Sequence, residues 1–155
     1  MKIFIDGSAG TTGLRIKDRL MKRSDVELIT LSEEQRKDTE SRKQALNSAQ
    51  VAFLCLPDAA AVEAVELVEN PDTVIIDTST AHRTSEGWAY GFPELSAEFE
   101  DKIKNSKRIA VPGCHAGGFI ALVYPLVEAG VLGNDALLSC YSLTGYSGGG
   151  KKMIA

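Results

Sequence analysis

The most reactive side chain that the sequence offers is the cysteine of the tripeptide Pro112-Gly113-Cys114. The tripeptide follows an apolar, strand-like run and precedes a long, helix-like run, so the thiol is expected at a helix N-terminus. Backbone N–H groups and the positive end of the helix dipole favour thiolate over thiol at such a position. A thiolate attacks an activated acyl group and leaves a thioester whose carbonyl accepts hydride. Cys114 is therefore the predicted catalytic nucleophile.

A glycine-rich turn near the start of the chain could hold a nucleotide. Gly7, Gly10 and Gly13 lie between a strand-like and a helix-like run, in a variant of the dinucleotide-binding fingerprint. Glycine there lets a pyrophosphate approach the backbone N–H groups at a helix N-terminus. Taken alone, the same spacing also fits a plain tight turn. The predicted cofactor-binding residues of this turn are Gly7, Ser8, Ala9, Gly10, Thr11, Thr12 and Gly13.

The end of the second strand-like run bears on the choice between NAD and NADP. Enzymes specific for NAD commonly carry an acidic residue there, which accepts the ribose 2′-hydroxyl and repels a 2′-phosphate. This chain has the neutral Ser32, followed by Arg36 and Lys37, which favours NADP. Glu33 and Glu34 would oppose the phosphate if they turned inward, and the two basic residues could instead form a solvated helix face.

A general acid or base is harder to find, because the chain has only two histidines. His115 directly follows Cys114, and adjacent side chains on a helix point about 100° apart, so it is a poor partner for the thiol. His82 and the neighbouring Arg83 could line the site or could brace loops through hydrogen bonds. No residue is a convincing general base.

Residues 145–152 imitate a phosphate-binding P-loop, with glycines followed by a lysine. The pattern fails at Lys152, where a magnesium-ligating Ser or Thr is required. The segment is predicted to be a glycine turn that approaches cofactor or substrate, with a plain connecting loop as the alternative.

Strand-like and helix-like runs alternate along the chain, which predicts a parallel sheet covered by helices on both faces. Every residue of chemical interest follows a predicted strand, so these residues should share the carboxyl edge of the sheet, where ligands bind. Residues 33–44 are highly charged and could be a loop as easily as a helix. The expected strands are 2–5, 26–31, 51–56, 73–77, 108–111 and 137–144, and the expected helices are 14–22, 33–49, 59–68 and 116–129.

Composition sets the class of the protein. The 155 residues are 44% hydrophobic and 25% charged, which is ordinary for a globular chain and makes one domain the default. A net charge of −4 without a basic stripe argues against nucleic-acid binding. No apolar run reaches membrane-spanning length and no signal-peptide pattern opens the chain, so a cytoplasmic location is expected.

The remaining cysteines are predicted to be structural. The three cysteines are widely spaced and include no Cys-x-x-Cys pair and no Cys/His cluster. This spacing argues against disulfides and against a metal site. Cys55 and Cys140 lie in apolar, strand-like runs, where a cysteine usually serves as a small core residue.

Taken together, these residues make the chain resemble the N-acetyl-γ-glutamyl-phosphate reductase family of arginine biosynthesis, in its shorter sequence type. The motifs appear in the family's order and cover essentially the whole chain. They are residues 7–13 (GSAGTTG), 53–58 (FLCLPD), 77–83 (DTSTAHR), 90–95 (YGFPEL), 112–114 (PGC) and 144–150 (TGYSGGG).

The resemblance implies an NADP-binding Rossmann domain, with a mostly parallel sheet and helices on both faces, in residues 1–113. Residues 114–155 would begin an α/β catalytic and oligomerisation domain like that of the glyceraldehyde-phosphate and aspartate-semialdehyde dehydrogenases. In the implied reaction, Cys114 attacks the acyl phosphate of N-acetyl-glutamyl phosphate, and NADPH then reduces the thioester to the semialdehyde. Family members are longer, form homo-oligomers and take their catalytic histidine from a later part of the chain.

The resemblance also assigns residues around the reacting groups. Beside the first glycine motif and the candidates Ser32 and Arg36, the cofactor side would include Leu56, Pro57, Ser79, Ser147, Gly148 and Gly149. The substrate side would include His82, Arg83, Tyr90, Pro93 and Glu94.

Three other functions remain compatible with the residues. An aspartate-semialdehyde dehydrogenase would use the same thioester chemistry on a different acyl phosphate. A non-catalytic NADP-binding module would need the glycine turn alone. A thiol redox sensor has least support, because no resolving cysteine lies at short spacing from Cys114.

Overall fold

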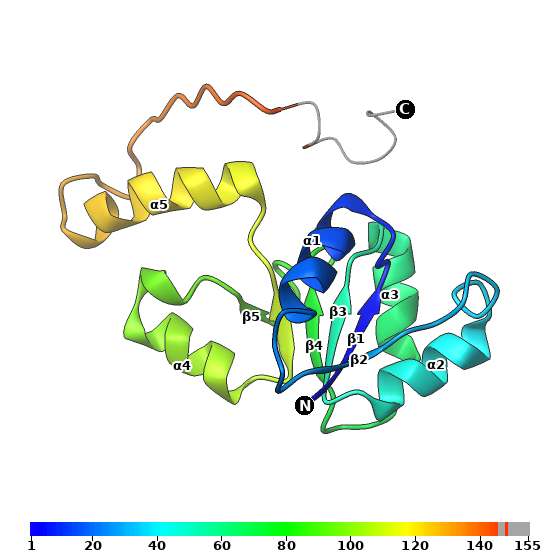
Figure 1. The fold of residues 1–155 in the computed structure, drawn as a ribbon. Coiled ribbons are helices and arrows are strands. Elements are labelled where there is room, and N and C mark those ends of the chain that lie inside the picture. The colour runs from blue at the N-terminus through cyan, green and yellow to red at the C-terminus, as the bar shows by residue number, and fades with distance from the viewer. Residues whose placement is uncertain (146–147, 149–155) are drawn as a thin grey trace.

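The structure is a computed structural model that describes residues 1–145 and residue 148. Within these residues, six parallel strands form one sheet in the order β2-β1-β3-β4-β6-β5 (Figure 1). The strands are β1 (Lys2–Asp6), β2 (Glu27–Ile29), β3 (Val51–Leu54), β4 (Val74–Asp77), β5 (Ala89–Tyr90) and β6 (Arg108–Ala110). The prediction of a parallel α/β sheet is confirmed.

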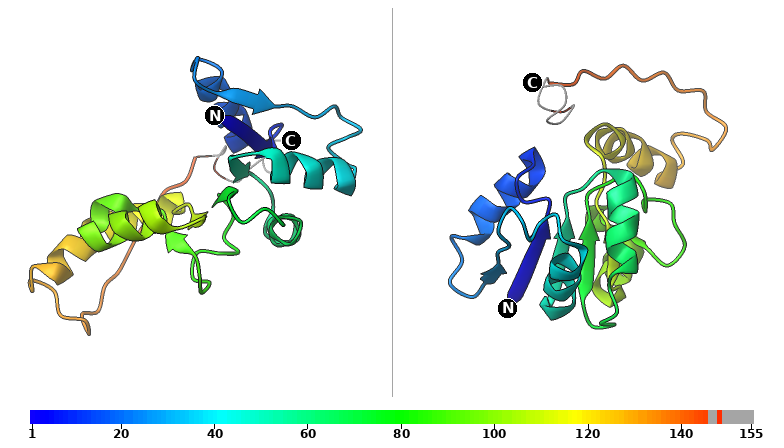
Figure 2. Two further views of the ribbon diagram at one scale, coloured as in Figure 1. Left: turned by 90° about the horizontal axis from the view of Figure 1, so that it is seen from below. Right: turned by 90° about the vertical axis from the view of Figure 1, so that its right-hand side faces the viewer.

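Helices cover both faces of the sheet. Helices α2 and α3 lie on one face, whereas α1 and α4 lie on the other (Figures 1 and 2). This doubly wound arrangement is what right-handed crossovers between parallel strands produce. The helices are α1 (Thr11–Leu20), α2 (Thr39–Ser48), α3 (Asp58–Glu66), α4 (Ala97–Asn105) and α5 (Cys114–Glu128), with a short 3-10 helix η1 at Pro93–Leu95.

The core lies between the central strands and the helices α2 and α3. Leu46 of α2 and Leu54 of β3 are completely buried, and small side chains on α3 let that helix approach the sheet closely. The buried hydrophobic residues are Ile3, Phe4, Ile5, Ala45, Leu46, Ala49, Ala52, Leu54, Ala61, Ala64, Ile75, Ala89 and Ala110.

Capping explains where two of the helices begin. Asp38 accepts a hydrogen bond of 2.7 Å from the N–H of Ser41, so α2 begins at Thr39 and not at residue 33 as the sequence predicted. Residues 33–38 lie before the helix, mostly in turns, so the loop alternative offered for residues 33–44 is confirmed for 33–38 and wrong for 39–44. Ser96 caps α4 through the N–H of Phe99. The sequence analysis missed α4 and the two-residue strand β5.

One predicted strand is absent. Residues 137–144 were expected to form a strand, but in the described part of the chain they have no strand partner, and each of them is exposed. Cys140, predicted to be a core residue, is therefore exposed. The prediction is wrong because a strand forms only where a neighbouring strand accepts its hydrogen bonds.

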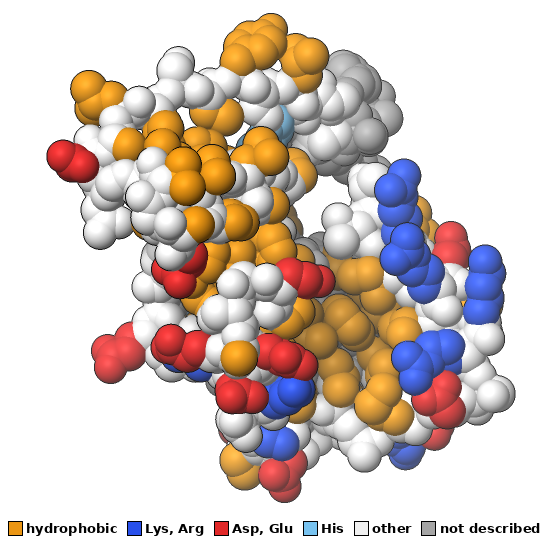
Figure 3. Space-filling view, turned by 90° about the vertical axis from the view of Figure 1, so that its left-hand side faces the viewer, with side chains coloured by type: hydrophobic (Ala, Val, Ile, Leu, Met, Phe, Trp, Pro, Cys, Tyr) orange, Lys and Arg blue, Asp and Glu red, His pale blue; other side chains and the backbone are white. Residues whose placement is uncertain are grey.

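Helix α5 is apolar in sequence yet lies outside the core. No residue of 111–145 is buried, and Phe119, Leu122 and Leu126 are among its exposed large side chains. Figure 3 shows hydrophobic side chains gathered over α5 on this face of the molecule. Among the helices in the described part of the chain, none combines the length and apolar character needed to cross a membrane.

Candidate active site

The glycine turn lies at the point of the sheet where the chain order reverses, between β1 and β3. Gly7 has a φ of +82°, and a Cβ there would lie 2.2 Å from the carbonyl oxygen of Cys55. A Cβ on Gly13 would lie 2.4 Å from the carbonyl oxygen of Gly7. Both positions therefore require glycine, for conformation and for close packing.

The turn leads into α1 with its first N–H groups free of side-chain caps. Gly10 is the N-cap residue, and no side chain there accepts a hydrogen bond from the helix. Such an N-terminus presents N–H donors and a positive dipole end to an anion. The turn therefore fits the pyrophosphate of a dinucleotide, as its sequence predicts.

A hollow beside the turn carries two basic side chains. Arg36 and Lys17 both line it, whereas Ser32 does not, because Ser32 exchanges hydrogen bonds of 2.9 and 3.2 Å with Gln35. Lys17 was not singled out from the sequence. The lining residues are Phe4, Ile5, Ser8, Lys17, Leu28, Ile29, Thr30, Leu31 and Arg36.

An ion pair fixes the end of β1 directly before the glycine turn. Arg42 of α2 donates to one carboxylate oxygen of Asp6 from Nε at 3.0 Å and from Nη2 at 2.8 Å. The Asp6 side chain is 6% exposed, so the pair is largely shielded from water. Sequence analysis missed this pair, because its members are far apart in the chain.

The turn after β3 is tied to the loop after β4. Pro57 precedes α3 without a side-chain cap, and Leu56 approaches the glycine turn, with its Cδ2 3.2 Å from where a Gly7 Cβ would be. The carboxylate of Asp58 accepts hydrogen bonds from the hydroxyl and the N–H of Thr80. These bonds, the hydroxyl bond foremost, lower the pKa of Asp58.

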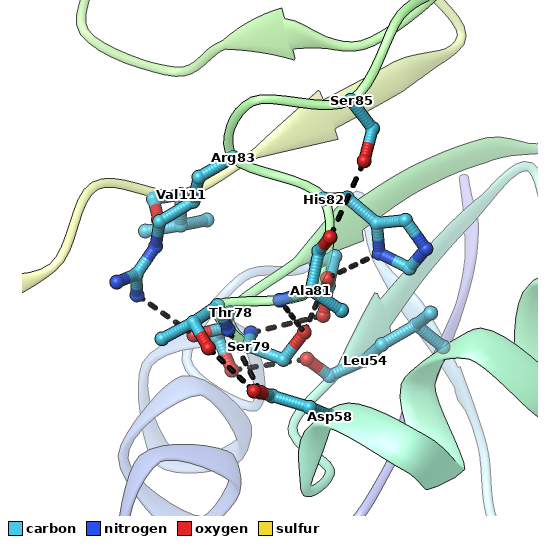
Figure 4. Close-up of polar contacts among 11 residues, drawn as sticks. Leu54, Asp58, Thr78, Ser79, Ala81, His82, Arg83, Ser85 and Val111 are labelled. Atoms are coloured by element: carbon cyan, nitrogen blue, oxygen red, sulfur yellow. Dashed lines mark hydrogen bonds and ion pairs between the residues drawn. The ribbon is translucent and has the colours of Figure 1, made fainter.

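Asp77, at the carboxyl end of β4, organises the following loop (Figure 4). Its buried carboxylate accepts from the N–H and hydroxyl of Ser79, at 2.9 and 2.6 Å, and pairs with Nδ1 of His82 at 2.7 Å. The ring of His82 stacks on Trp88 with centroids 4.1 Å apart. His82 thus has the bracing role that the sequence left open. The Ser79 hydroxyl is already committed to Asp77.

Arg83 connects this loop to the strand that leads to Cys114. Its Nε donates to the carbonyl of Val111 at 3.0 Å and its Nη2 to that of Thr78 at 3.3 Å (Figure 4). The guanidinium also lies against Gly113, directly before Cys114. Arg83 therefore links the segments that follow the neighbouring strands β4 and β6.

Cys114 is the first residue of α5, so the predicted placement of the thiol at a strand-to-helix junction is confirmed. The N-cap residue Gly113 provides no side-chain cap, and Cys114 is exposed. Free N–H groups in this first turn can stabilise an oxyanion formed on an acyl group at the sulfur. His115 turns away to contact the hydroxyl of Ser142 through Nδ1.

The substrate-side candidates lie next to this junction. Tyr90 of β5 pairs with Ala110, and the N–H of Gly91 donates to the Ala110 carbonyl at 2.8 Å. Pro93 and Glu94 are exposed on η1, which contacts α5. The structure therefore brings these three candidates to the end of β6 that leads to the thiol.

Two further predictions fall on the end of the chain. The N–H of Gly148 donates to the Gly145 carbonyl at 2.9 Å, whereas Ser147 and Gly149 lie outside the described residues. Cys114 and Cys140 line one hollow between α5 and residues 138–142. Among the described residues, no group of His, Cys, Asp and Glu side chains could hold a metal ion.

Cys55 differs from both of these thiols. It is half-buried behind the glycine turn, and burial raises the pKa of its thiol to about 11. Its thiol is therefore protonated at neutral pH and fits the predicted structural role.

A doubly wound parallel sheet with this turn at its reversal point defines a dinucleotide-binding domain of the Rossmann class. Over residues 2–105, the sequence matches the family described as semialdehyde dehydrogenase, NAD binding domain. The chain belongs to that family.

Curated relatives confirm the resemblance noted in the sequence. The chain is 51% identical over 152 residues to N-acetyl-gamma-glutamyl-phosphate reductase 2 of Pseudomonas putida, covering 98% of this chain and 49% of the relative. It is 54% identical over 153 residues to N-acetyl-gamma-glutamyl-phosphate reductase of a Chelativorans species, covering 99% of this chain and 49% of that relative. The chain thus spans about half the length of the curated relatives it matches.

Solved structures confirm the fold. Aspartate semialdehyde dehydrogenase from Francisella tularensis superposes with a TM-score of 0.62 at 17% identity, covering 84% of this chain and 41% of that one. Aspartate semialdehyde dehydrogenase II from Vibrio cholerae, complexed with ASA, gives a TM-score of 0.59 at 18% identity, covering 83% and 46%.

Proposed function

We propose that this chain provides the NADP-binding part and the nucleophile of an N-acetyl-γ-glutamyl-phosphate reductase. The enzyme would reduce N-acetyl-glutamyl 5-phosphate to N-acetyl-glutamate 5-semialdehyde and phosphate. The observation that carries the proposal is the position of Cys114, at the start of α5 and beyond the carboxyl end of β6, in the sheet whose β1 leads into the glycine turn. Sequence identities of 51% and 54% to curated reductases, over nearly the whole of this chain, support the choice of substrate.

The residues around the glycine turn fit a dinucleotide. The uncapped N–H groups of α1 would bind the pyrophosphate, and Leu56 and Pro57 would pack against the cofactor. With its hydroxyl held by Asp77, Ser79 would contribute through its backbone. When bound, NADPH supplies the hydride. Gly148 and its neighbours 147 and 149 would lie near the nicotinamide.

The basic hollow supports NADP over NAD. Arg36 and Lys17 line it from the loop after β2 and from α1. Two cations near the ribose would attract a 2′-phosphate, and no carboxylate is among the residues that line this hollow. The exposed Glu33 and Glu34 lie outside that lining.

The chemistry at Cys114 follows from its surroundings. The thiolate sulfur attacks the acyl carbon, and phosphate leaves with the electron pair of the broken C–O bond. N–H groups of the first turn of α5 stabilise the oxyanion of the tetrahedral intermediate. Hydride addition to the thioester carbonyl then breaks the C–S bond, which releases the aldehyde and restores the thiolate.

Other parts of the proposal concern substrate, assembly and location. Arg83, Tyr90, Pro93 and Glu94 would face the acyl phosphate, while His82 would support them through Asp77. The enzyme would act as a homo-oligomer in the cytoplasm. All three cysteines are free, which agrees with a reducing compartment.

The proposal is tested by binding and turnover measured together. Calorimetry should show saturable NADP binding to the chain, weaker binding of NAD, and loss of the NADP preference in Arg36→Ala with Lys17→Ala. In a complete protein that contains this chain, phosphate-dependent NADP reduction should occur with N-acetyl-glutamate semialdehyde and be abolished by Cys114→Ser but not by Cys140→Ser.

The same assay separates the alternatives. Turnover of aspartate semialdehyde in preference to the N-acetylated substrate would favour the aspartate-semialdehyde dehydrogenase function, whose fold the solved structures share. NADP binding by the chain, without turnover by a complete protein that contains it, would leave a nucleotide-binding module. A chimera that carries this chain in place of the matching half of the Pseudomonas putida relative provides a second turnover measurement.

A further inference from the structure

Arg83 is held unusually firmly for a loop arginine that is only half-buried. The residue before it, His82, is fixed between the buried Asp77 carboxylate and the ring of Trp88. Arg83 itself donates to the backbone carbonyls of Val111 and Thr78. Its guanidinium is therefore anchored from the loop and from the strand end at once.

The guanidinium lies where a side chain of Gly113 would be. A Cβ on Gly113 would be 2.6 Å from Nη1, 3.2 Å from Cζ and 3.4 Å from Nη2 of Arg83, and these are the three nearest atoms. The backbone of Gly113, at φ −77° and ψ 152°, is one that alanine adopts without strain. A side chain at position 113 would therefore displace the Arg83 guanidinium, although the turn itself would accept it.

Gly113 is the N-cap residue of α5 and precedes the thiol by one position. Its carbonyl accepts the first helical bond, from the N–H of Gly117 at 2.6 Å. A shift at Gly113 would therefore move the sulfur relative to the N–H groups that surround it. Residues 111–145 contain no buried side chain, and the other contact that holds this junction is the hydrogen bond from the Val111 N–H to the Asp77 carbonyl at 2.8 Å.

We propose that Arg83 is a positioning residue that sets the start of α5, and with it the Cys114 thiol, through its contact with Gly113 and its hydrogen bond to Val111. This inference rests on the proposed function of Cys114 as the nucleophile. It assigns Arg83 a role that does not depend on a bound substrate.

Alkylation of the chain by iodoacetamide, followed by peptide mapping, tests this role without cofactor or substrate. The exposed Cys140 is an internal control in the same molecule. Arg83→Ala should slow alkylation of Cys114 about fivefold or more, because the thiol loses its place at the helix N-terminus, and should leave Cys140 unchanged. Arg83→Lys should behave like Arg83→Ala, because lysine keeps the charge but not the planar fork.

Gly113→Ala supplies the decisive comparison. Alone it should slow Cys114 about as much as Arg83→Ala, whereas in the Arg83→Ala background it should add nothing, since the atoms it would meet are gone. Gly117→Ala is the matched control, because its new Cβ would lie at an ordinary 3.7 Å from the Pro112 side chain. Circular dichroism shows whether each variant is folded. If Gly113→Ala does not fold, the alkylation rate of Cys114 in Arg83→Ala still tests the positioning role of Arg83.

Three results would overturn the inference: an unchanged Cys114 rate in Arg83→Ala, a wild-type rate in Arg83→Lys, or additive effects of the two substitutions. The first and third would show that the contact does not place the thiol, and the second that charge alone matters. None of them bears on whether Cys114→Ser abolishes turnover, so the proposed function is judged separately.

Discussion

The two parts of the molecule that meet at Cys114 are built in opposite ways. The sheet body, residues 2–110, contains all the buried hydrophobic side chains, whereas the helix arm, residues 111–145, contains no buried residue at all. The cofactor side of the candidate site therefore belongs to a packed scaffold. Cys114, the proposed nucleophile, is the fourth residue of the arm. The cofactor side of the candidate site is therefore positioned by the packed core, whereas Cys114 is positioned by contacts at the junction between the sheet body and α5.

The cysteines show the same contrast. Cys55 lies in the sheet body, where burial raises its pKa to about 11, whereas Cys114 and Cys140 are exposed in the helix arm. The contacts that link the arm to the body include the hydrogen bond from the Val111 N–H to the Asp77 carbonyl at 2.8 Å and the contacts of Arg83 with Val111 and Gly113. Further along the arm, η1 contacts α5, and Phe99 forms an edge-to-face pair with Tyr124 at 6.3 Å.

The largest loss of unfolding free energy is expected for a substitution in the glycine turn of the sheet body. Gly7→Ala adds a left-handed backbone penalty to a backbone clash with Cys55, which should lower the free energy of unfolding by about 2–5 kcal/mol. Urea unfolding measures the loss. Gly10→Ala is the control, since its Cβ would lie 3.4 Å from the nearest atom, and equal losses in both variants would contradict the tight packing of the turn.

The next largest effect should follow from removal of the Asp77 carboxylate. Asp77→Ala leaves the donors of Ser79 and His82 without their buried acceptor and should cost about 2–4 kcal/mol of unfolding free energy. Asp38→Ala, which removes an exposed cap, should cost only about 1 kcal/mol. Similar losses in the two variants would argue against a rigid loop after β4.

Alkaline pH should destabilise the sheet body through Cys55. Its thiol has a pKa raised from 9.0 to about 11 by burial, so the stabilising effect of the neutral thiol is fully present below pH 9. Between pH 9 and 11 the thiol ionises in the unfolded chain first, which lowers the free energy of unfolding. The loss should be about 1–2 kcal/mol, because one pKa unit corresponds to about 1.4 kcal/mol and partial exposure weakens the effect.

The measurement is the difference between wild type and Cys55→Ala as pH rises, which removes the contributions of other titrating groups. The two unfolding free energies should converge over this range. A difference that is constant with pH would show that Cys55 is as accessible as the thiols of the helix arm.

The smallest effect is expected on the exposed face of α5. Leu122 is 74% exposed, so Leu122→Ser should change the free energy of unfolding by less than about 0.5 kcal/mol. Leu46→Ala in the sheet body should cost about 2–5 kcal/mol, because Leu46 is completely buried. A large loss for Leu122→Ser would break the distinction between the two regions.

The sequence predicted the sheet body better than the helix arm for a physical reason. The glycine turn, the alternation of strands with helices and the position of Cys114 depend on local conformation and on burial on both faces, which leave periodic patterns. Residues 137–144 have a strand pattern, but strand formation needs a partner elsewhere in the chain. The same non-local requirement explains why Cys140 was wrongly expected in the core.

Within the site, two of the contacts that sequence analysis missed are between distant segments. Asp6 with Arg42 and Arg83 with Gly113 join residues that only the fold brings together. Helix α4, by contrast, could have been found, because Ser96 is a good cap and two Glu-Lys pairs at i and i+4 follow it.

We expect Cys114, at the boundary between the sheet body and the helix arm, to accept an acyl group. Incubation of the chain with N-acetyl-γ-glutamyl phosphate, without cofactor, followed by mass spectrometry of its peptides, tests that claim most directly. We expect an acyl adduct on Cys114 that NADPH releases and that is absent in Cys114→Ser. Cys55 and Cys140 should stay unmodified. An adduct on Cys140 with Cys114 free, or no adduct on any cysteine, would contradict it.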